Sequence, residues 1–406
     1  MDKASPGVPW LSIIGVNEDG LAGLGRPARD ALAAAETVFG GARHLRLAAG
    51  GITGVALAWP SPFSVAPVLA LRGQTVVVLA SGDPMWHGVG ATLLRDLPPG
   101  EARVFPQASC ASIAAARLGW PLAEVTTLSL LARNVALLRP HLHPGARLIL
   151  LTSDAAQPPA IAALLAADGF GASRVTLLEA LGGPDERISS GTAASFGLPA
   201  IHPLNTLAVE VVAGAGARLL PRAPGLPDDL FHHDGQLTKR EVRAITLSAL
   251  RPLPGALLWD VGAGAGSIGI EWMLAHPTCR AIGIEARADR AARVSANAAA
   301  CGVPGLRVVV GEAPGALAGL PAPDAVFLGG GATDPGVFDA TLAALRPGGI
   351  FVANAVTLET EALLLARHAA QGGEILRIGI SRAVAVASMT GWRPAMPVTQ
   401  WVWVKP

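Results

Sequence analysis

The sequence of 406 residues contains no tyrosine, only three cysteines and few charged residues. Charged residues make up 15% of the chain, and 31 Lys and Arg nearly balance 30 Asp and Glu, which leaves a formal net charge of +1. No long run of basic residues is present, so a nucleic-acid substrate is not expected. The 51% of apolar residues predicts instead a core-rich globular protein of two or three domains.

The few cysteines and the interrupted apolar stretches exclude further classes. The cysteines lie far apart without a CxxC pair, which favours neither a disulfide framework nor a metal site and fits a reducing cytoplasm. The longest uncharged stretch, 47–71, contains Pro60, Pro62 and Pro67, so no membrane-spanning helix is expected. The first ten residues lack a basic segment leading into an apolar one, and no secretory signal is expected.

Short apolar runs alternate with Ala- and Leu-rich stretches throughout the chain, which predicts the α/β fold class. In the first half, strands are expected at 11–15, 75–80, 147–151, 174–178 and 206–211. In the second half, parallel strands are expected at 256–261, 280–285, 307–310, 324–329 and 349–354. The Gly- and Pro-rich segment 213–236 predicts a linker between a first domain, 1–212, and a second domain, 237–406.

A glycine-rich turn in the second half indicates a nucleoside site. Asp260 ends a predicted strand, and Gly262, Gly264 and Gly266 follow it at the start of a predicted helix. Glycines there let the backbone turn tightly and approach a ligand closely. The next predicted strand ends in Glu285, roughly 20 residues past the glycines, where a carboxylate can accept the ribose hydroxyls.

The charge at this turn favours one nucleoside cofactor over another. A dinucleotide-binding turn reads GxGxxG and presents a helix N-terminus to pyrophosphate, whereas this turn reads GAGAGS after an aspartate that would repel phosphate. A carboxylate suits a cationic ligand, so the sulfonium cofactor S-adenosylmethionine is favoured over NAD. A turn without any ligand is the remaining alternative.

Five segments of the second half resemble, in order and with suitable gaps, the decarboxylating precorrin methyltransferase module of cobalamin synthesis. They are residues 235–243, 260–272, 311–317, 324–331 and 346–360. The resemblance implies a Rossmann-like class I methyltransferase fold that methylates carbon 15 of a precorrin and removes a carboxyl group. It implies a cofactor pocket formed by Asp260, Gly262, Gly264, Ser267, Glu285 and Ala313, with Thr238 near its mouth. Gly329, Gly330 and Asn354 are implied to lie near the substrate.

Some of these residues also have simple structural explanations. Thr238 and Glu241 have the spacing of a capping box, so Thr238 is expected to cap a helix, to contact the cofactor, or both. The glycines at 329–331 end a predicted strand, where they allow a ligand to approach closely or merely form a turn. Asn297 is left out of the site, because exposure to solvent is a sufficient explanation for an asparagine at that position.

The first half carries a different set of motifs. Gly82 and Asp83 precede a proline after an apolar strand, a sharp turn in which Asp83 can accept hydrogen bonds from local amides. Together with residues 11–15, 105–120, 182–187 and 205–211, this turn resembles the tetrapyrrole methylase family over most of 10–215. The resemblance implies two subdomains, 10–107 and 108–215, with S-adenosylmethionine in the cleft between them. It implies cofactor contacts at Gly82, Asp83, Met85 and Ser109 and methylation of carbon 5 of a precorrin.

The first half also departs from this family. Leu131 and Ala132 stand where the family has histidine and glycine. The resemblance therefore does not carry the family's polar contacts over to these two positions, and a module that holds the tetrapyrrole without methylating it remains an alternative. His87 is expected to be a surface histidine of the loop rather than a proton carrier.

Taken together, the resemblances imply an enzyme that uses S-adenosylmethionine to convert precorrin-6B to precorrin-8, without a metal, and that forms a homo-oligomer. The carboxylates of such a substrate call for arginines at the cleft rim, and Arg133, Arg240 and Arg243 are candidates. The candidate proton donors are His232, His233 and Glu312. A methyltransferase acting on RNA or protein would share the second fold, but the near-neutral charge argues against it.

Overall fold

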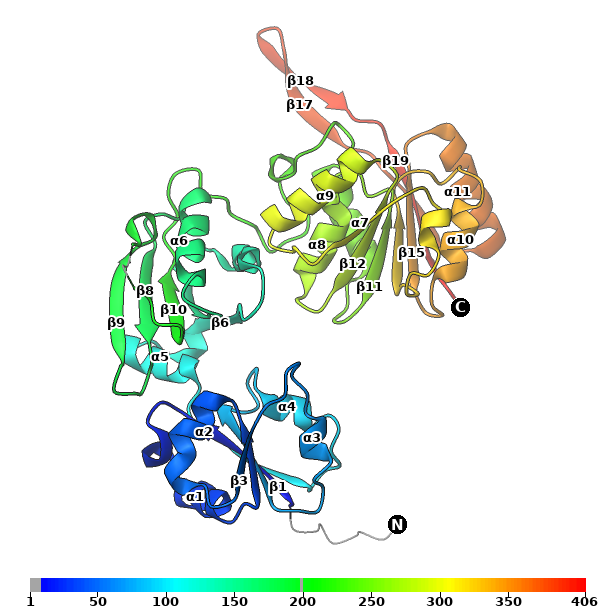
Figure 1. Ribbon diagram of the computed structural model, residues 1–406. Helices are drawn as coiled ribbons and strands as arrows, with labels where there is room; N and C mark the ends of the chain where they lie inside the picture. The colour runs from blue at the N-terminus through cyan, green and yellow to red at the C-terminus, as the bar shows by residue number, and fades with distance from the viewer. Residues whose placement is uncertain (1–8, 198–199) are drawn as a thin grey trace. The chain divides into compact units, whose positions relative to one another are not determined.

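The computed structural model describes residues 9–197 and 200–406, which form two compact units (Figure 1). The first unit contains the chain up to residue 135 and residues 143–218, and the second contains 219–406 together with 136–142. The boundary between the units, after residue 218, thus lies inside the expected linker. Leu220, Leu226 and Phe231 of that linker are buried in the core of the second unit. The domain limits at 212 and 237 stay predictions, and most of the first ten residues lie outside the described part.

The first unit is built on two five-stranded sheets that correspond to the two expected subdomains. The first sheet is parallel and has the order β3-β2-β4-β1-β5, with β1 (Leu11–Val16), β2 (Thr37–Gly40), β3 (Val55–Ala58), β4 (Val76–Ser81) and β5 (Ala102–Phe105). The second sheet is mixed and has the order β6-β7-β10-β8-β9, with β6 (Val125–Ser129), β7 (Arg147–Leu151), β8 (Arg174–Glu179), β9 (Arg187–Thr192) and β10 (Asn205–Glu210).

Helices cover both faces of the first sheet, which explains why its central strands are apolar along their whole length. Helices α1 (Arg26–Ala33) and α2 (Ala42–Ala48) pack on one face, and α3 (Ala66–Leu69) and α4 (Val89–Leu93) pack on the other. The second sheet is accompanied by α5 (Cys110–Leu118) and α6 (Gln157–Ala167).

The second unit contains a seven-stranded sheet of order β13-β12-β11-β14-β15-β19-β16. Its strands are β11 (Leu257–Val261), β12 (Arg280–Glu285), β13 (Arg307–Val310), β14 (Ala325–Leu328), β15 (Ile350–Ala355), β16 (Glu374–Ile378) and β19 (Val398–Val404). The pairs from β13 to β15 are parallel, as predicted, and β19 runs antiparallel to both of its neighbours. The carboxyl ends of β11, β12 and β14 therefore share one edge of the sheet, where open α/β sheets bind ligands.

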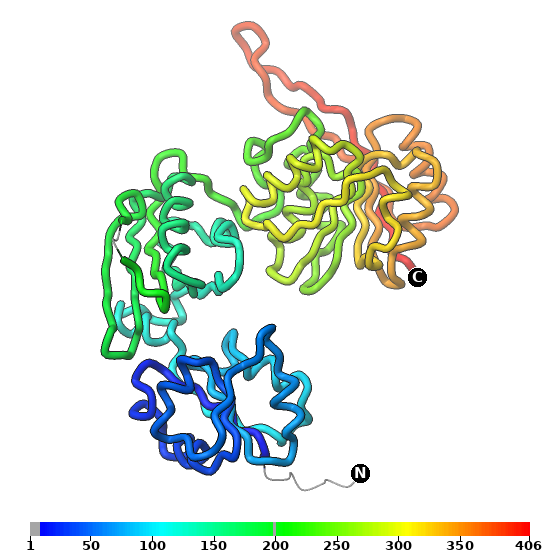
Figure 2. The backbone as a smooth tube through the Cα atoms, in the orientation of Figure 1, coloured from blue at the N-terminus to red at the C-terminus, as the bar shows by residue number. Residues whose placement is uncertain are grey.

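Two layers of helices enclose this sheet. Helices α7 (Arg240–Leu250), α8 (Ser267–Ala275) and α9 (Ala288–Ala300) pack on one face, and α10 (Val337–Ala344) and α11 (Leu358–Gln371) pack on the other. A hairpin of β17 (Ser381–Val386) and β18 (Met389–Pro394) stands away from the rest of the unit (Figure 2).

Every strand expected from the sequence is present, with ends that differ by at most one residue. Within residues 9–197 and 200–406, no helix has both the length and the apolar character needed to cross a membrane.

Candidate cofactor sites

The turn after β11 has the backbone of a ligand-binding loop. Gly262, Gly264 and Gly266 adopt φ angles of 74°, 59° and 77°, in the left-handed region that glycine occupies most readily. A Cβ atom on Gly264 would lie 3.3 Å from the carbonyl oxygen of Gln236, so a side chain there would press against the facing segment. Glycine at 264 thus keeps the turn and residues 235–238 close to each other.

Two buried carboxylates end neighbouring strands beside this turn. Oδ2 of Asp260, at the end of β11, accepts a hydrogen bond of 2.9 Å from the backbone N–H of Gly269. Oε2 of Glu285, at the end of β12, accepts one of 2.8 Å from Gly264. Burial, with the charge of Glu285 nearby, raises the pKa of Asp260 to about 7. A cationic ligand would favour the ionised form of Asp260 and would offset the cost of burying its charge.

An open cavity of about 500 Å³ adjoins the turn, a size that suits a small organic ligand. The expected residues that line it are Thr238, Asp260, Gly262, Gly264, Ser267, Gly329 and Asn354. Of the other residues expected here, Glu285, Ala313, Gly330 and Arg240 are not among the described residues of its lining. Glu285 nevertheless reaches the turn through its hydrogen bond to Gly264.

The capping box predicted for Thr238 and Glu241 is wrong. Helix α7 begins at Arg240 with Lys239 as its N-cap, and no side chain caps it. The carboxylate of Glu241 pairs with Arg382 instead. Thr238 is left facing the cavity, which favours the alternative in which it contacts the cofactor.

The prediction that Arg243 lies at the rim of the cleft is also wrong. Its side chain is completely buried, and its guanidinium lies 4.8 Å above the ring of Phe231. Its Nε donates to Glu271 over 2.5 Å, and its other nitrogens donate to Asp228 and to backbone carbonyls. Because these donors are already occupied inside the protein, Arg243 is a structural residue.

Exposure to solvent, the explanation given for Asn297, is wrong as well, because its side chain on α9 has no exposed surface. Its amide accepts from the backbone N–H of His232 and donates to the carbonyls of His232 and Ala265, each over 2.9 Å. One side chain therefore joins the segment that precedes α7 to the glycine turn.

The cations that do line this cavity are Lys239 and Arg382, which the sequence analysis missed. Lys239 belongs to the motif that contains Thr238, whereas Arg382 lies on β17, where nothing in the sequence indicated a site. The candidate proton donors His232, His233 and Glu312 are exposed and are not among the described lining residues.

The first unit has its own cavity, of about 350 Å³, and Gly82, Asp83 and Ser109 line it as expected. The carboxylate of Asp83 accepts a hydrogen bond of 2.9 Å from the backbone N–H of Met85, which confirms the predicted turn. Ser109 also caps α5, because its hydroxyl accepts from Ser112 over 3.1 Å. Met85 and Arg133 are exposed and are not among the described lining residues.

Several polar residues of this first cavity were not found from the sequence. His44 lies 2.8 Å from the hydroxyl of Ser81 through Nε2, and Arg43 contacts both side chains. Burial, and then the charge of Arg43, lowers the pKa of His44 to about 4, so its imidazole is neutral near pH 7. Leu131, which replaces the family's histidine, lines the same cavity, and so does His87.

Comparison with known proteins gives concordant matches to both halves. Residues 11–197 match the family described as tetrapyrrole (corrin/porphyrin) methylases, and residues 229–405 match the precorrin methyltransferase domain. A precorrin-6Y C(5,15)-methyltransferase (decarboxylating) of a Sinorhizobium species is 58% identical over 399 residues, which are 98% of this chain and 97% of that one. The protein of the same description from Mycobacterium tuberculosis (strain CDC 1551 / Oshkosh) is 40% identical over 396 residues, 96% and 98% of the two chains.

A solved structure matches the second half. The crystal structure of the C-terminal domain of precorrin-6Y C5,15-methyltransferase from Rhodobacter capsulatus is 48% identical, with a TM-score of 0.44. The match covers 46% of this chain and 100% of that one.

Proposed function

The chain belongs to the family of precorrin-6Y C(5,15)-methyltransferases (decarboxylating), and from this premise we propose that its two cavities are separate cofactor sites that serve different carbons. The enzyme takes its methyl groups from S-adenosylmethionine. In the proposal, the cavity of the first unit serves carbon 5, and the cavity of the second unit serves carbon 15 and the decarboxylation. The observation that carries it is that most of the cofactor residues expected from each half line one of two different cavities: Gly82, Asp83 and Ser109 in the first, and Thr238, Asp260, Gly262, Gly264 and Ser267 in the second.

The second cavity has the chemistry that S-adenosylmethionine requires. In the proposal, Asp260 faces the positively charged end of the cofactor, and Glu285, held by Gly264, accepts the ribose hydroxyls. Gly262, Gly264 and Ser267 leave room for the backbone to approach the nucleoside. Thr238 is assigned to the cofactor as well, and Gly329 and Asn354 are assigned to the part of the cavity left for the substrate. Ala313 is retained only as a residue implied by the family.

In the first cavity, the proposal assigns the cofactor to Gly82, Asp83 and Ser109. Met85 would act only indirectly, because its backbone N–H binds the carboxylate of Asp83 and so holds the turn. The apolar wall at Leu131 leaves methylation at this site possible, because alignment of the reacting atoms needs shape more than charge.

The chemistry asks little of the protein beyond alignment. S-adenosylmethionine supplies an electrophilic methyl group, and a reduced tetrapyrrole carbon attacks it as an enamine does. Holding the two in line can supply most of the acceleration. The electron pair released by the departing carboxyl group enters the protonated conjugated macrocycle, so the chain's own role is to place the ring and to supply a proton.

We further propose precorrin-6B as the substrate. Lys239 and Arg382 line the second cavity, where they would pair with carboxylates of this substrate. Arg240, which is exposed on the first turn of α7, would extend this basic rim, and Arg133 would serve the first unit in the same way. A near-neutral net charge of +1 supports this acidic small molecule over RNA.

Two properties of the whole protein are proposed with it. The exposed apolar side chains of the β17–β18 hairpin, Val386, Met389 and Trp392, support a homo-oligomer in which a second copy covers them. Three free cysteines support a cytoplasmic location.

The test is mass spectrometry of precorrin-6B incubated with the full chain and with its Asp260→Ala variant. We expect the full chain to add two methyl groups and release one CO2. The variant is expected to add one methyl group and release no CO2.

Other outcomes would contradict this division of work. Addition of a single methyl group by the unmodified chain would assign a mere holding role to the first unit. Activity on RNA without any precorrin product would overturn the substrate, and an unaffected Asp260→Ala variant would overturn the second site.

A further inference from the structure

The segment that forms one wall of the second cavity is not part of a helix or strand. Gly235, Gln236, Leu237 and Thr238 line the cavity and precede α7. These residues lie close to the glycine turn, because a Cβ atom on Gly264 would be 3.3 Å from the carbonyl oxygen of Gln236. A shift of this segment would therefore change the width of the cavity on the side of the glycine turn.

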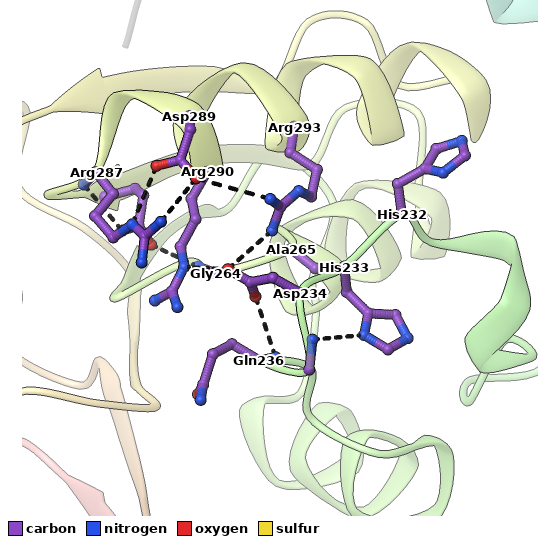
Figure 3. Close-up of polar contacts among 12 residues, drawn as sticks. His232, His233, Asp234, Gln236, Gly264, Ala265, Arg287, Asp289, Arg290 and Arg293 are labelled. Atoms are coloured by element: carbon purple, nitrogen blue, oxygen red, sulfur yellow. Dashed lines mark hydrogen bonds and ion pairs between the residues drawn. The ribbon is translucent and has the colours of Figure 1, made fainter.

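Side chains of α9 hold this segment at its centre (Figure 3). Oδ2 of Asp234 accepts a hydrogen bond of 2.8 Å from Nε of Arg290 and lies 3.2 Å from a terminal nitrogen of Arg293. Oδ1 of the same carboxylate accepts from the backbone N–H of Gln236 over 3.2 Å. One carboxylate thus connects the helix to the backbone of a residue that lines the cavity.

These ion pairs are partly shielded from solvent. The side chains of Arg290 and Arg293 are 22% exposed, and that of Asp234 is 27% exposed. The Arg290 guanidinium holds the pKa of Asp234 well below its usual range, so the carboxylate is ionised at any working pH. The pairs are therefore stronger than freely exposed ones, but they remain sensitive to salt.

A second connection fixes the start of the same segment. The amide of Asn297, about one turn beyond Arg293 on α9, binds both backbone groups of His232 and the carbonyl of Ala265 in the glycine turn. Helix α9 follows directly on β12, which carries Glu285. Helix α9, which follows the expected ribose-binding residue Glu285, thus also holds segment 232–238 on the opposite side of the cavity.

We propose that Asp234, through Arg290 and Arg293, is a positioning residue that latches segment 232–238 over the cofactor cavity of the second unit. The latch sets the affinity of this site for S-adenosylmethionine without touching the reacting atoms. It rests on the proposed assignment of this cavity to the cofactor.

The experiment measures cofactor binding at this site alone. Amide hydrogen exchange of the peptide that spans 231–239 is followed in the full chain during titration with S-adenosylhomocysteine, so that the cavity of the first unit does not contribute. We expect Asp234→Asn to weaken this binding roughly fivefold, the effect of losing two partly shielded ion pairs. CO2 release is expected to show a raised KM for S-adenosylmethionine with kcat nearly unchanged.

A matched control lies on the same helix. Asp289 pairs with Arg287 over 2.9 Å and lies 3.8 Å from Arg293, but no hydrogen bond or ion pair described for it reaches segment 232–238 (Figure 3). Asp289→Asn should leave the affinity unchanged, and Asp234→Glu should restore part of it. In a double-mutant cycle, Arg290→Gln should add little to Asp234→Asn, since both remove the same contact.

The outcomes separate this latch from the proposed site itself. If Asp234→Asn binds as tightly as the unmodified chain, or if Asp289→Asn weakens binding equally, the latch is overturned. If the titration protects no amides of 231–239 in the unmodified chain and Asp260→Ala retains CO2 release, the assignment of the cavity is overturned.

Discussion

A single buried carboxylate gives the second cavity a pH dependence. Burial and the nearby Glu285 raise the pKa of Asp260 to about 7, so below this pH the group is protonated when the cavity is empty. Binding of a cation requires its proton to leave. We therefore expect the affinity for S-adenosylmethionine to fall as the pH decreases from 7 to 5, by at most about tenfold per unit. The measurement is the exchange titration of 231–239, repeated across this range with S-adenosylmethionine in place of S-adenosylhomocysteine.

The comparison for this prediction is Asp260→Asn, which keeps the shape of the side chain but cannot ionise. Its affinity is expected to be weak and to vary little between pH 5 and 7. An equal pH dependence in both proteins would assign the titration to another group. A rise in the affinity of the unmodified chain toward low pH would contradict the sign of the argument.

At the same scale, the sequence indicated Asp260, Glu285 and the glycines because strand ends and turns are local features. It could not indicate that Asn297 and Arg243 are buried. Both lie on amphipathic helices, whose buried face depends on what packs against it. Here the predicted linker, 213–236, packs against both side chains. The cations of the lining were missed because Lys239 precedes α7 and Arg382 lies on β17, where nothing in the sequence indicated a site.

At the scale of elements, Arg243 on α7 binds Glu271 on α8 and backbone carbonyls of the segment before α7. Glu271 on α8 is buried, and besides Arg243 it accepts hydrogen bonds from Gly225 and Leu226 over 2.7 Å and 2.9 Å. Arg243→Met should leave the charge of Glu271 buried without its cation, at a cost of about 3–5 kcal/mol. Urea unfolding, followed by a signal from the second unit, measures this loss.

Arg240→Met is the matched control, because Arg240 lies on the same helix and is exposed. A change of less than about 0.5 kcal/mol is expected for it. Equal unfolding midpoints for the two variants would show that the buried pair carries no stability.

The elements that the sequence predicted are those with a strong local pattern. In the two sheets that helices cover on both faces, the strands that the sequence predicted are apolar, and their limits were found within one residue. The strands β2, β3, β5, β16 and β19 of the same sheets were not predicted. The β17–β18 hairpin was missed because most of its side chains are exposed, so its sequence has no alternation of buried and exposed residues. A cap was predicted for Thr238 because its spacing to Glu241 fits, whereas α7 begins one residue later than a Thr238 cap requires and Glu241 pairs with Arg382.

At the scale of the whole molecule, the hairpin is the feature that the single chain leaves unexplained. Trp392 is 76% exposed and Met389 is 74% exposed, a large apolar surface for two neighbouring strands. In the described part of the chain, β17 and β18 pair only with each other, so their outer edges offer unpaired backbone groups. A second copy of this chain would cover both the side chains and the edges.

Replacing Met389 and Trp392 by serine should therefore lower the molar mass of the protein in solution to that of a smaller assembly. The reason is that two apolar side chains at the centre of the proposed interface are lost, while the fold of each unit is not touched. Light scattering coupled to size-exclusion chromatography measures the mass. Leu358→Ser, which removes an apolar side chain 80% exposed on α11, is the control and should leave the mass unchanged. An unmodified chain that is monomeric at the highest soluble concentration, or a double variant of unaltered mass, would remove the hairpin as the site of assembly.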